Sequence, residues 1–143
     1  VNPNGPFISA GSNGDNGQTG RKLVMDYYGP RVPIGGGALS GKDLTHIDRA
    51  GAYAARQAAV ETVARGAKHC KVTVAYAPNC DEPLDVAFEC EGGVRPPGRE
   101  RFRHSAIRER FQGQAFDARW GVCSHFFEAD VPWDRAYVTT ELA

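Results

Sequence analysis

The sequence lacks a long hydrophobic run and lacks an excess of either charge. No apolar stretch approaches the ~20 residues that a membrane span requires, and no charged segment followed by an apolar one opens the chain. Lysine plus arginine and aspartate plus glutamate both number 17, so no net field attracts nucleic acid or an anionic membrane. We therefore expect neither a nucleic-acid nor a membrane partner, and a cytoplasmic location.

Metal and nucleophile patterns are also missing. The four cysteines, at positions 70, 80, 90 and 123, show no CxxC spacing and no histidine at a ligand spacing beside them. Reduced, buried thiols are expected, although Cys70 and Cys90 lie equally far from Cys80, which leaves cross-strand pairing open. The histidines are scattered, and no Ser/His/Asp or Cys/His pattern predicts a catalytic residue.

One long helix is predicted over residues 45–65. Thr45 is the expected N-cap, with Asp48 three residues later in a relative of the capping box, and Gly66 is the expected stop. The helix contains small residues that let it approach a sheet closely: Ala50, Gly51, Ala52, Ala54, Ala55, Ala58 and Ala59. We expect this face to pack flat on strands.

Strands are predicted on both sides of this helix. A strand fragment at residues 7–8 and a strand over 22–28 precede it, and strands over 71–76 and 84–88 form a hairpin around a turn-rich segment. The charged residues 99–112, with three spaced apolar anchors, predict a shorter and more exposed helix. The aromatic-rich segment 120–133 is expected to be extended and to supply the last strand. The order β-β-α-β-β-α-β predicts an α+β fold, a two-layer sandwich with helices on one face of a mixed sheet. The 143 residues suffice for one domain, 1–143, with one core.

The strongest chemical signal is a glycine cluster that ends in lysine. Residues 36–42, GGALSGK, fit the first seven positions of G-x-x-x-x-G-K-[ST], between a predicted strand and helix. In such a loop backbone N–H groups converge on phosphate, and the helix N-terminus and lysine add positive charge. Asp43 replaces the hydroxyl that would hold magnesium, and the chain has no room for parallel βαβ units, so we reject a true P-loop. A different phosphate-binding loop is predicted, with a tight glycine turn under the helix as the alternative.

A second glycine-rich loop, residues 14–22, ends in adjacent cations. Arg21 can grip phosphate with two hydrogen bonds and Lys22 can neutralise it as a point charge. Two such loops suggest one shared polyanion. Asp15 can accept a hydrogen bond from a ribose hydroxyl or an ammonium group, or it can form an Asx-turn. Asp48 can bind Mg²⁺ near the phosphates, or it can serve the helix N-terminus electrostatically.

At these residues the sequence resembles the C-terminal domain of S-adenosylmethionine synthetases. The segments that carry the resemblance are VNPNGPF (1–7), GD (14–15), QTGRK (18–22), GGGALSGKD (35–43), DR (48–49) and AYAAR (52–56). The match is dense over residues 1–56, looser through the hairpin and weak from 91 to 120. It partly returns at residues 125–126 and 132–134.

The resemblance implies an enzyme of one-carbon metabolism that joins ATP and methionine to form S-adenosylmethionine and cleaves the triphosphate to phosphate and pyrophosphate. It implies Mg²⁺, and K⁺ as a further cation. Phe7 would lie against the adenine, and Asp15 would touch adenosine and the methionine amino group. The implied site residues are Phe7, Asp15, Arg21, Lys22, Ala38 and Lys42 for ATP and triphosphate, Asp15 and His46 for methionine, and Asp48 for the metal.

The sequence also departs from the family pattern. His46 stands where the family has a second lysine of the glycine loop, and Pro6 stands where an arginine is expected beside the adenine-contacting phenylalanine. Two permanent positive charges are therefore missing from a site for a highly charged anion, and His46 restores one only when it is protonated.

The resemblance places the catalytic histidine and a magnesium-binding aspartate in an N-terminal domain, and a nucleotide loop in a middle domain. We therefore expect this chain not to be active alone, but to be a subunit or fragment of a methionine adenosyltransferase. Its partner would be a chain with the missing domains, or further copies in a homo-oligomer. The alternatives are a diverged module that binds ATP or polyphosphate to regulate a full-length synthetase, and a relocated nucleotide-processing enzyme.

Overall fold

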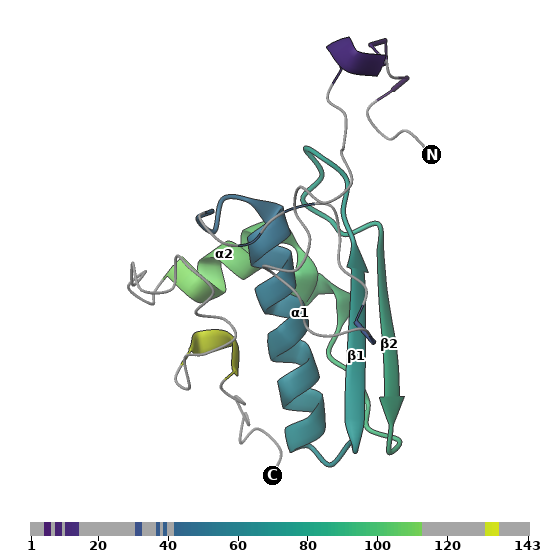
Figure 1. Ribbon diagram of the computed structural model, residues 1–143. Coiled ribbons are helices and arrows are strands. Elements are labelled where there is room, and N and C mark those ends of the chain that lie inside the picture. The colour runs from purple at the N-terminus through teal and green to yellow at the C-terminus, as the bar shows by residue number, and fades with distance from the viewer. Residues whose placement is uncertain are drawn as a thin grey trace.

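The structure, a computed structural model, describes residues 5, 6, 8, 9, 11–14, 31, 32, 37, 39, 42–112 and 131–134. Its elements are η1 (Gly11–Asn13), α1 (Ile47–Ala64), β1 (His69–Ala75), β2 (Asp85–Glu91), η2 (Arg99–Phe102), α2 (His104–Gln112) and η4 (Pro132–Asp134). Figure 1 shows α1 and α2 on one side of the hairpin formed by β1 and β2. The predicted α+β fold is confirmed. The mixed sheet depends on the predicted strands at 7–8 and 22–28. Residues 7 and 22–28 lie outside the described residues, and residue 8 belongs to no described element.

Helix α1 begins two residues later than predicted and ends one residue earlier, at Ala64, with Gly66 in the predicted role of stop. Gly66 has φ +109°, its N–H donates to Val63 O at 2.9 Å, and Ala67 N–H donates to Thr62 O at 3.3 Å. This is the Schellman pattern, which requires a residue that tolerates positive φ. The prediction of Thr45 as N-cap is wrong: the cap is His46, without a side-chain cap hydrogen bond. The Thr45 hydroxyl donates instead to Asp43.

The predicted hairpin is confirmed, with a register centred on position 80. β1 and β2 are antiparallel, and Val72 lies opposite Phe88. Cys70 lies opposite Cys90 and is joined to it by a disulfide. The expectation of reduced thiols is therefore wrong for this pair, because the register brings the two side chains to the same place on one face of the sheet. Cys80, in the turn, is a free cysteine.

The core lies between the small-residue face of α1 and the hairpin. Close approach is visible at Gly51, where an added Cβ would lie 2.7 Å from the ring of Tyr76. The buried cluster comprises Ala50, Tyr53, Ala54, Ala58, Phe102, Ile107, Phe111, Val131 and Trp133, and Val72, Val74, Val86 and Phe88 pack against it from the strands. The predicted packing of the alanine face on the sheet is confirmed. Within the described residues, no helix is long and apolar enough to cross a membrane.

The charged segment after the hairpin forms η2 and α2 rather than one continuous helix, and extended backbone at Arg103 (ψ 136°) separates them. The three predicted apolar anchors, Phe102, Ile107 and Phe111, are all buried. Arginines from this segment reach back to the rest of the fold. Arg99 donates to the carbonyl of Leu84 at 2.8 Å.

The start of α2 is capped from the hairpin turn, which predicts a pH-dependent stability. The Asp81 carboxylate accepts hydrogen bonds from Ser105 N–H and from the Ser105 hydroxyl, both at 2.7 Å. These bonds hold the pKa of Asp81 below its usual value of 3.8. A lowered pKa in the folded state means that the stabilisation is complete above about pH 4 and is lost as the pH falls through the lowered pKa.

We expect Asp81→Ala to lower the Tm, and to lower it more at pH 7 than at pH 3. Thermal unfolding followed by circular dichroism measures both differences. Asp85→Ala is the matched control, because it removes another exposed carboxylate, at the start of β2. Equal losses of Tm at the two pH values would show that Asp81 does not cap α2 through its charge.

Candidate functional site

The predicted lysine and the predicted metal-binding aspartate meet at the start of α1. Lys42 Nζ lies 2.6 Å from Asp48 Oδ2, and the two side chains are 25% and 44% exposed. The glycine loop comes close to the same carboxylate: a Cβ added at Gly37 would lie 2.0 Å from Asp48 Cγ. A side chain at position 37 would therefore require the Asp48 carboxylate to move. Gly37, Lys42 and the first turn of the helix are therefore neighbours in space.

A buried arginine fixes the lysine backbone to the core. Arg49 is fully buried. Its guanidinium donates to the carbonyl oxygen of Lys42 and, through Nε, to the Tyr53 hydroxyl at 2.6 Å. Sequence reasoning gave Arg49 no role, although an arginine inside an alanine-rich helix face is a signal, because a guanidinium is rarely buried without partners. Arg49 therefore fixes the backbone of Lys42 to the buried core.

Asp43 organises the turn that leads into α1. Its Oδ1 accepts from Thr45 N–H at 2.8 Å and from the Thr45 hydroxyl at 2.5 Å, and lies 3.4 Å from His46 Nδ1. The hydrogen bonds from the Thr45 side chain and backbone hold the pKa of Asp43 below its usual range. His46, 55% exposed, follows as the N-cap without capping the helix by its side chain. The first-turn N–H groups of α1 therefore have no capping hydrogen-bond partner in this side chain. Such a helix end can donate to an anion instead.

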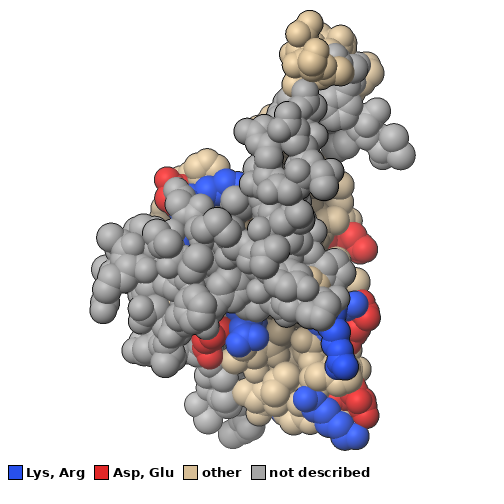
Figure 2. All heavy atoms as spheres, viewed as in Figure 1, with Lys and Arg blue, Asp and Glu red and all other residues tan. Residues whose placement is uncertain are grey.

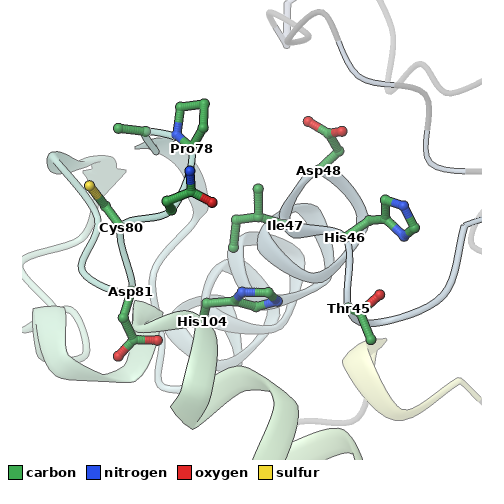
Figure 3. A pocket seen from close by; sticks show the side chains of 10 residues that line it. Thr45, His46, Ile47, Asp48, Pro78, Cys80, Asp81 and His104 are labelled. Carbon is green, nitrogen blue, oxygen red and sulfur yellow. The ribbon is translucent and has the colours of Figure 1, made fainter. Parts of the chain in front are cut away.

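A pocket of about 480 Å³ opens between the start of α1, the hairpin turn and the start of α2. Figure 3 shows Pro78, Cys80 and Asp81 on one side and Thr45, His46 and Asp48 on the other, with Ile47 and His104 between them. His104 is tied to the loop before α1 by a 3.3 Å contact between Nε2 and the Leu44 carbonyl. The pocket combines apolar and hydrogen-bonding groups.

The described residues do not form a metal-binding site from protein side chains alone. No group of three His, Cys, Asp or Glu side chains in the described part of the chain is placed to hold a metal ion. Asp48 is a single carboxylate, which suits Mg²⁺ only where substrate phosphates supply further oxygens. On the face shown in Figure 2, the described acidic and basic side chains lie next to one another. Any anion site is therefore local.

Of the predicted site residues, the structure brings three together. Lys42 and Asp48 form an ion pair, and His46 lines the pocket beside Asp48. The remaining predicted residues, Phe7, Asp15, Arg21, Lys22 and Ala38, lie outside the described residues. Their placement at the site remains a prediction.

Fold and site together describe an α+β arrangement in which Gly37 and Lys42 lie beside Asp48 at the N-terminal end of α1. The sequence matches the family described as S-adenosylmethionine synthetase, C-terminal domain, over residues 9–118. The chain belongs to this family. It is 40% identical to an S-adenosylmethionine synthase of Synechococcus sp. (strain JA-2-3B'a(2-13)) over 155 aligned residues, which cover 94% of this chain and 37% of that protein.

A solved structure has a similar fold. It is described as an unusual S-adenosylmethionine synthetase from Campylobacter jejuni, and it matches with a TM-score of 0.61 and 31% sequence identity. The match covers 81% of this chain and 34% of that one. The chain thus spans little more than a third of the length of these relatives.

Proposed function

We propose that this domain supplies triphosphate-binding and nucleotide-binding loops to a methionine adenosyltransferase, which converts ATP and methionine to S-adenosylmethionine, phosphate and pyrophosphate. The observation that carries the proposal is the placement of Lys42. Its backbone is held by the buried Arg49, and its ammonium group lies at the N-terminal end of α1. Membership of the family supports the same assignment.

Three kinds of positive group converge in this proposal. Lys42 contributes a full charge, and the first turn of α1 contributes its N–H groups and partial charge. Arg21 and Lys22 contribute from the second loop, with the Ala38 backbone beside the nucleotide. Lys42 then exchanges the Asp48 carboxylate for a phosphate oxygen. Its pairing with Asp48 keeps the ammonium group in place until the anion arrives.

Asp48 is the proposed protein ligand for Mg²⁺, together with oxygens of the bound phosphates. Mg²⁺, when bound, would neutralise phosphate charge, and K⁺ is proposed as a further cation. Phe7 against the adenine and Asp15 at the methionine amino group complete the proposed substrate contacts. His46 is proposed to face the methionine, and its position at the pocket supports this.

The chemistry itself is proposed to need the family's N-terminal and middle domains, from the same polypeptide, a partner chain or other copies in an oligomer. No residue of this chain is proposed as catalytic. A cytoplasmic setting is part of the proposal, because ATP and methionine are cytoplasmic metabolites.

A second candidate function is a regulatory module that binds ATP or polyphosphate without turnover. It is favoured by His46, which stands where the family has a lysine. Histidine is not a permanent cation, and His46 lies near the Asp43 carboxylate. The two functions differ when the family's other two domains are supplied with ATP, methionine, Mg²⁺ and K⁺. Formation of S-adenosylmethionine supports the enzyme, whereas triphosphate binding without product supports the module.

Lys42→Ala tests the triphosphate site directly. We expect the variant to lose about 1.5–3 kcal/mol of binding to inorganic triphosphate, the range for a hydrogen bond to a charged group, or roughly 10- to 150-fold in Kd. Calorimetric titration measures the loss. Lys71→Ala is the matched control, because Lys71 pairs with Glu89 on the hairpin. If Lys42→Ala binds triphosphate as well as the wild type, the loop is only a structural turn and the proposal fails.

Asp48→Asn separates the two roles of the carboxylate. Without Mg²⁺, the variant should bind triphosphate about fivefold more tightly. The substitution removes the repulsion between the Asp48 carboxylate and the anion, which is worth about 1 kcal/mol at contact distance. With Mg²⁺, the metal should improve its binding less than it improves that of the wild type. Titrations with and without Mg²⁺ decide this, with Asp85→Asn as the control. Equal improvement by Mg²⁺ in the variant and the wild type would mean that Asp48 does not bind the ion.

A further inference from the structure

Two cysteines that the proposed function does not use face each other across the hairpin. Cys70 on β1 lies opposite Cys90 on β2, their Cα atoms are 4.2 Å apart, and a disulfide joins them. Both residues are half-buried rather than enclosed. They share the sheet face of Val72 and Phe88, one residue pair from the end of the hairpin, and their partial exposure leaves room for a small thiol or disulfide reagent to reach them.

Contacts that involve no sulfur hold this register. On one side of the cysteine pair, Lys71 Nζ lies 2.7 Å from Glu89 Oε1. On the other side, Lys68 Nζ lies 2.9 Å from Glu91 Oε1, and Lys68 N–H donates to the Glu91 carbonyl at 2.8 Å. Because these contacts survive reduction, the two thiols stay opposite each other. Groups held in this way have a high effective concentration for each other.

We propose that Cys70 and Cys90 form a reversible thiol–disulfide pair that sets the stability of this domain according to the redox state of its surroundings. In oxidation, one cysteine thiolate attacks a disulfide reagent RSSR and releases one RSH. The other cysteine then displaces the second RSH and closes the protein disulfide. The two cysteine protons leave with the two released thiols. A dithiol reductant reverses both steps and becomes a disulfide itself.

The pair is placed to change stability rather than ligand binding. It closes a loop with a sequence separation of 20 residues, which restricts the unfolded chain. It also lies at the end of the hairpin next to the C-terminal end of α1, where an added Cβ at Gly92 would lie 3.1 Å from Ala67 Cα. The pocket lies at the opposite end, at the turn of residues 77–81. Reduction should therefore lower the stability of the domain without reshaping the pocket.

The test uses the purified 143-residue chain in two states, reduced with excess dithiothreitol and oxidised with glutathione disulfide. Free thiols are trapped with N-ethylmaleimide, and peptide mapping by mass spectrometry identifies the linked cysteines. We expect the Cys70–Cys90 link to disappear on reduction and to form again on oxidation. The folded-to-unfolded ratio should fall by roughly 10²-fold on reduction, which lowers the Tm by about 10 °C.

Three controls make the result specific. Cys70→Ser and Cys90→Ser should each abolish the redox dependence of the Tm, whereas Cys80→Ser should retain it. The comparison of wild-type states needs no variant, so it holds even if a serine variant folds poorly. The proposal is overturned if Cys70 and Cys90 stay unlinked under oxidation, if either links to another cysteine instead, or if the Tm is the same in both states.

Discussion

Arg101→Met should lower the free energy of unfolding by about 3–5 kcal/mol, the cost of leaving a buried charge without its partner. Glu61, on α1, is only 2% exposed, and both of its carboxylate oxygens accept hydrogen bonds from the Arg101 guanidinium, at 2.5 and 2.9 Å. Hydrogen bonding to Glu61 raises the pKa of Arg101. Methionine preserves much of the side-chain volume and removes the charge, so the loss reports on the ion pair.

Two comparisons isolate this effect. Arg103→Met removes a neighbouring arginine whose partner Glu82 is exposed, and such a surface pair contributes at most about 1 kcal/mol. The double variant Arg101→Met, Glu61→Leu should recover most of the lost stability, because the buried carboxylate is removed together with its partner. Urea unfolding measures all three variants. A loss in Arg101→Met as small as that in Arg103→Met would mean that water reaches Glu61 in the folded protein.

Trp133→Ala should cost about 3–5 kcal/mol, the usual cost of truncating a buried large aromatic residue. Trp133 is 3% exposed, stacks on Tyr53 with 3.7 Å between ring centroids, and meets the Phe111 ring edge-on at 6.5 Å. Its neighbour Asp134 accepts a hydrogen bond from Arg56 at 2.6 Å. Truncation therefore removes the main contact by which η4 packs on α1.

Trp133→Phe is the matched control, because it keeps a ring against Tyr53 and should lose clearly less. Ile8→Ala gives the baseline, since Ile8 is 97% exposed and makes little contact; its loss should be within about 0.5 kcal/mol. Denaturant unfolding compares the three variants. If Trp133→Ala is no worse than Ile8→Ala, η4 is not packed on α1 in solution.

The stability losses expected for Arg101→Met and Trp133→Ala are large compared with the total free energy of unfolding. Domains of this kind have free energies of unfolding of about 5–15 kcal/mol, so either variant removes a substantial fraction. Both contacts join segments far apart in the sequence: 40 residues separate Glu61 from Arg101. The helix layer therefore depends on a few long-range contacts between side chains as well as on the alanine packing of α1.

Part of the site was readable from the sequence. The glycine spacing before Lys42 predicted a loop that runs into a helix, and the structure brings Gly37, Lys42 and Asp48 together there. The Thr45 cap failed because a nearby carboxylate, Asp43, competes for its hydroxyl. Arg49 was missed because its importance lies in its burial and in its bond to the Lys42 carbonyl. Neither property is visible in a local pattern.

The sequence by itself determined the local features of this protein. A glycine at 66 ends α1, because only positive φ completes that helix end. Alternating residues on either side of position 80 form the hairpin, and three spaced apolar residues anchor the charged segment. These features follow from backbone sterics and side-chain period within a few residues. The resemblance of the sequence motifs to one family was also readable, and the comparisons bear it out.

Only the tertiary structure decided which distant side chains meet. It pairs Glu61 with Arg101 and stacks Trp133 on Tyr53. It also joins Cys70 to Cys90, a pairing that the symmetric spacing allowed without requiring it. The physical reason is that such contacts depend on how whole elements pack. Many pairings are compatible with one local pattern, and the packing of α1 on the hairpin selects among them.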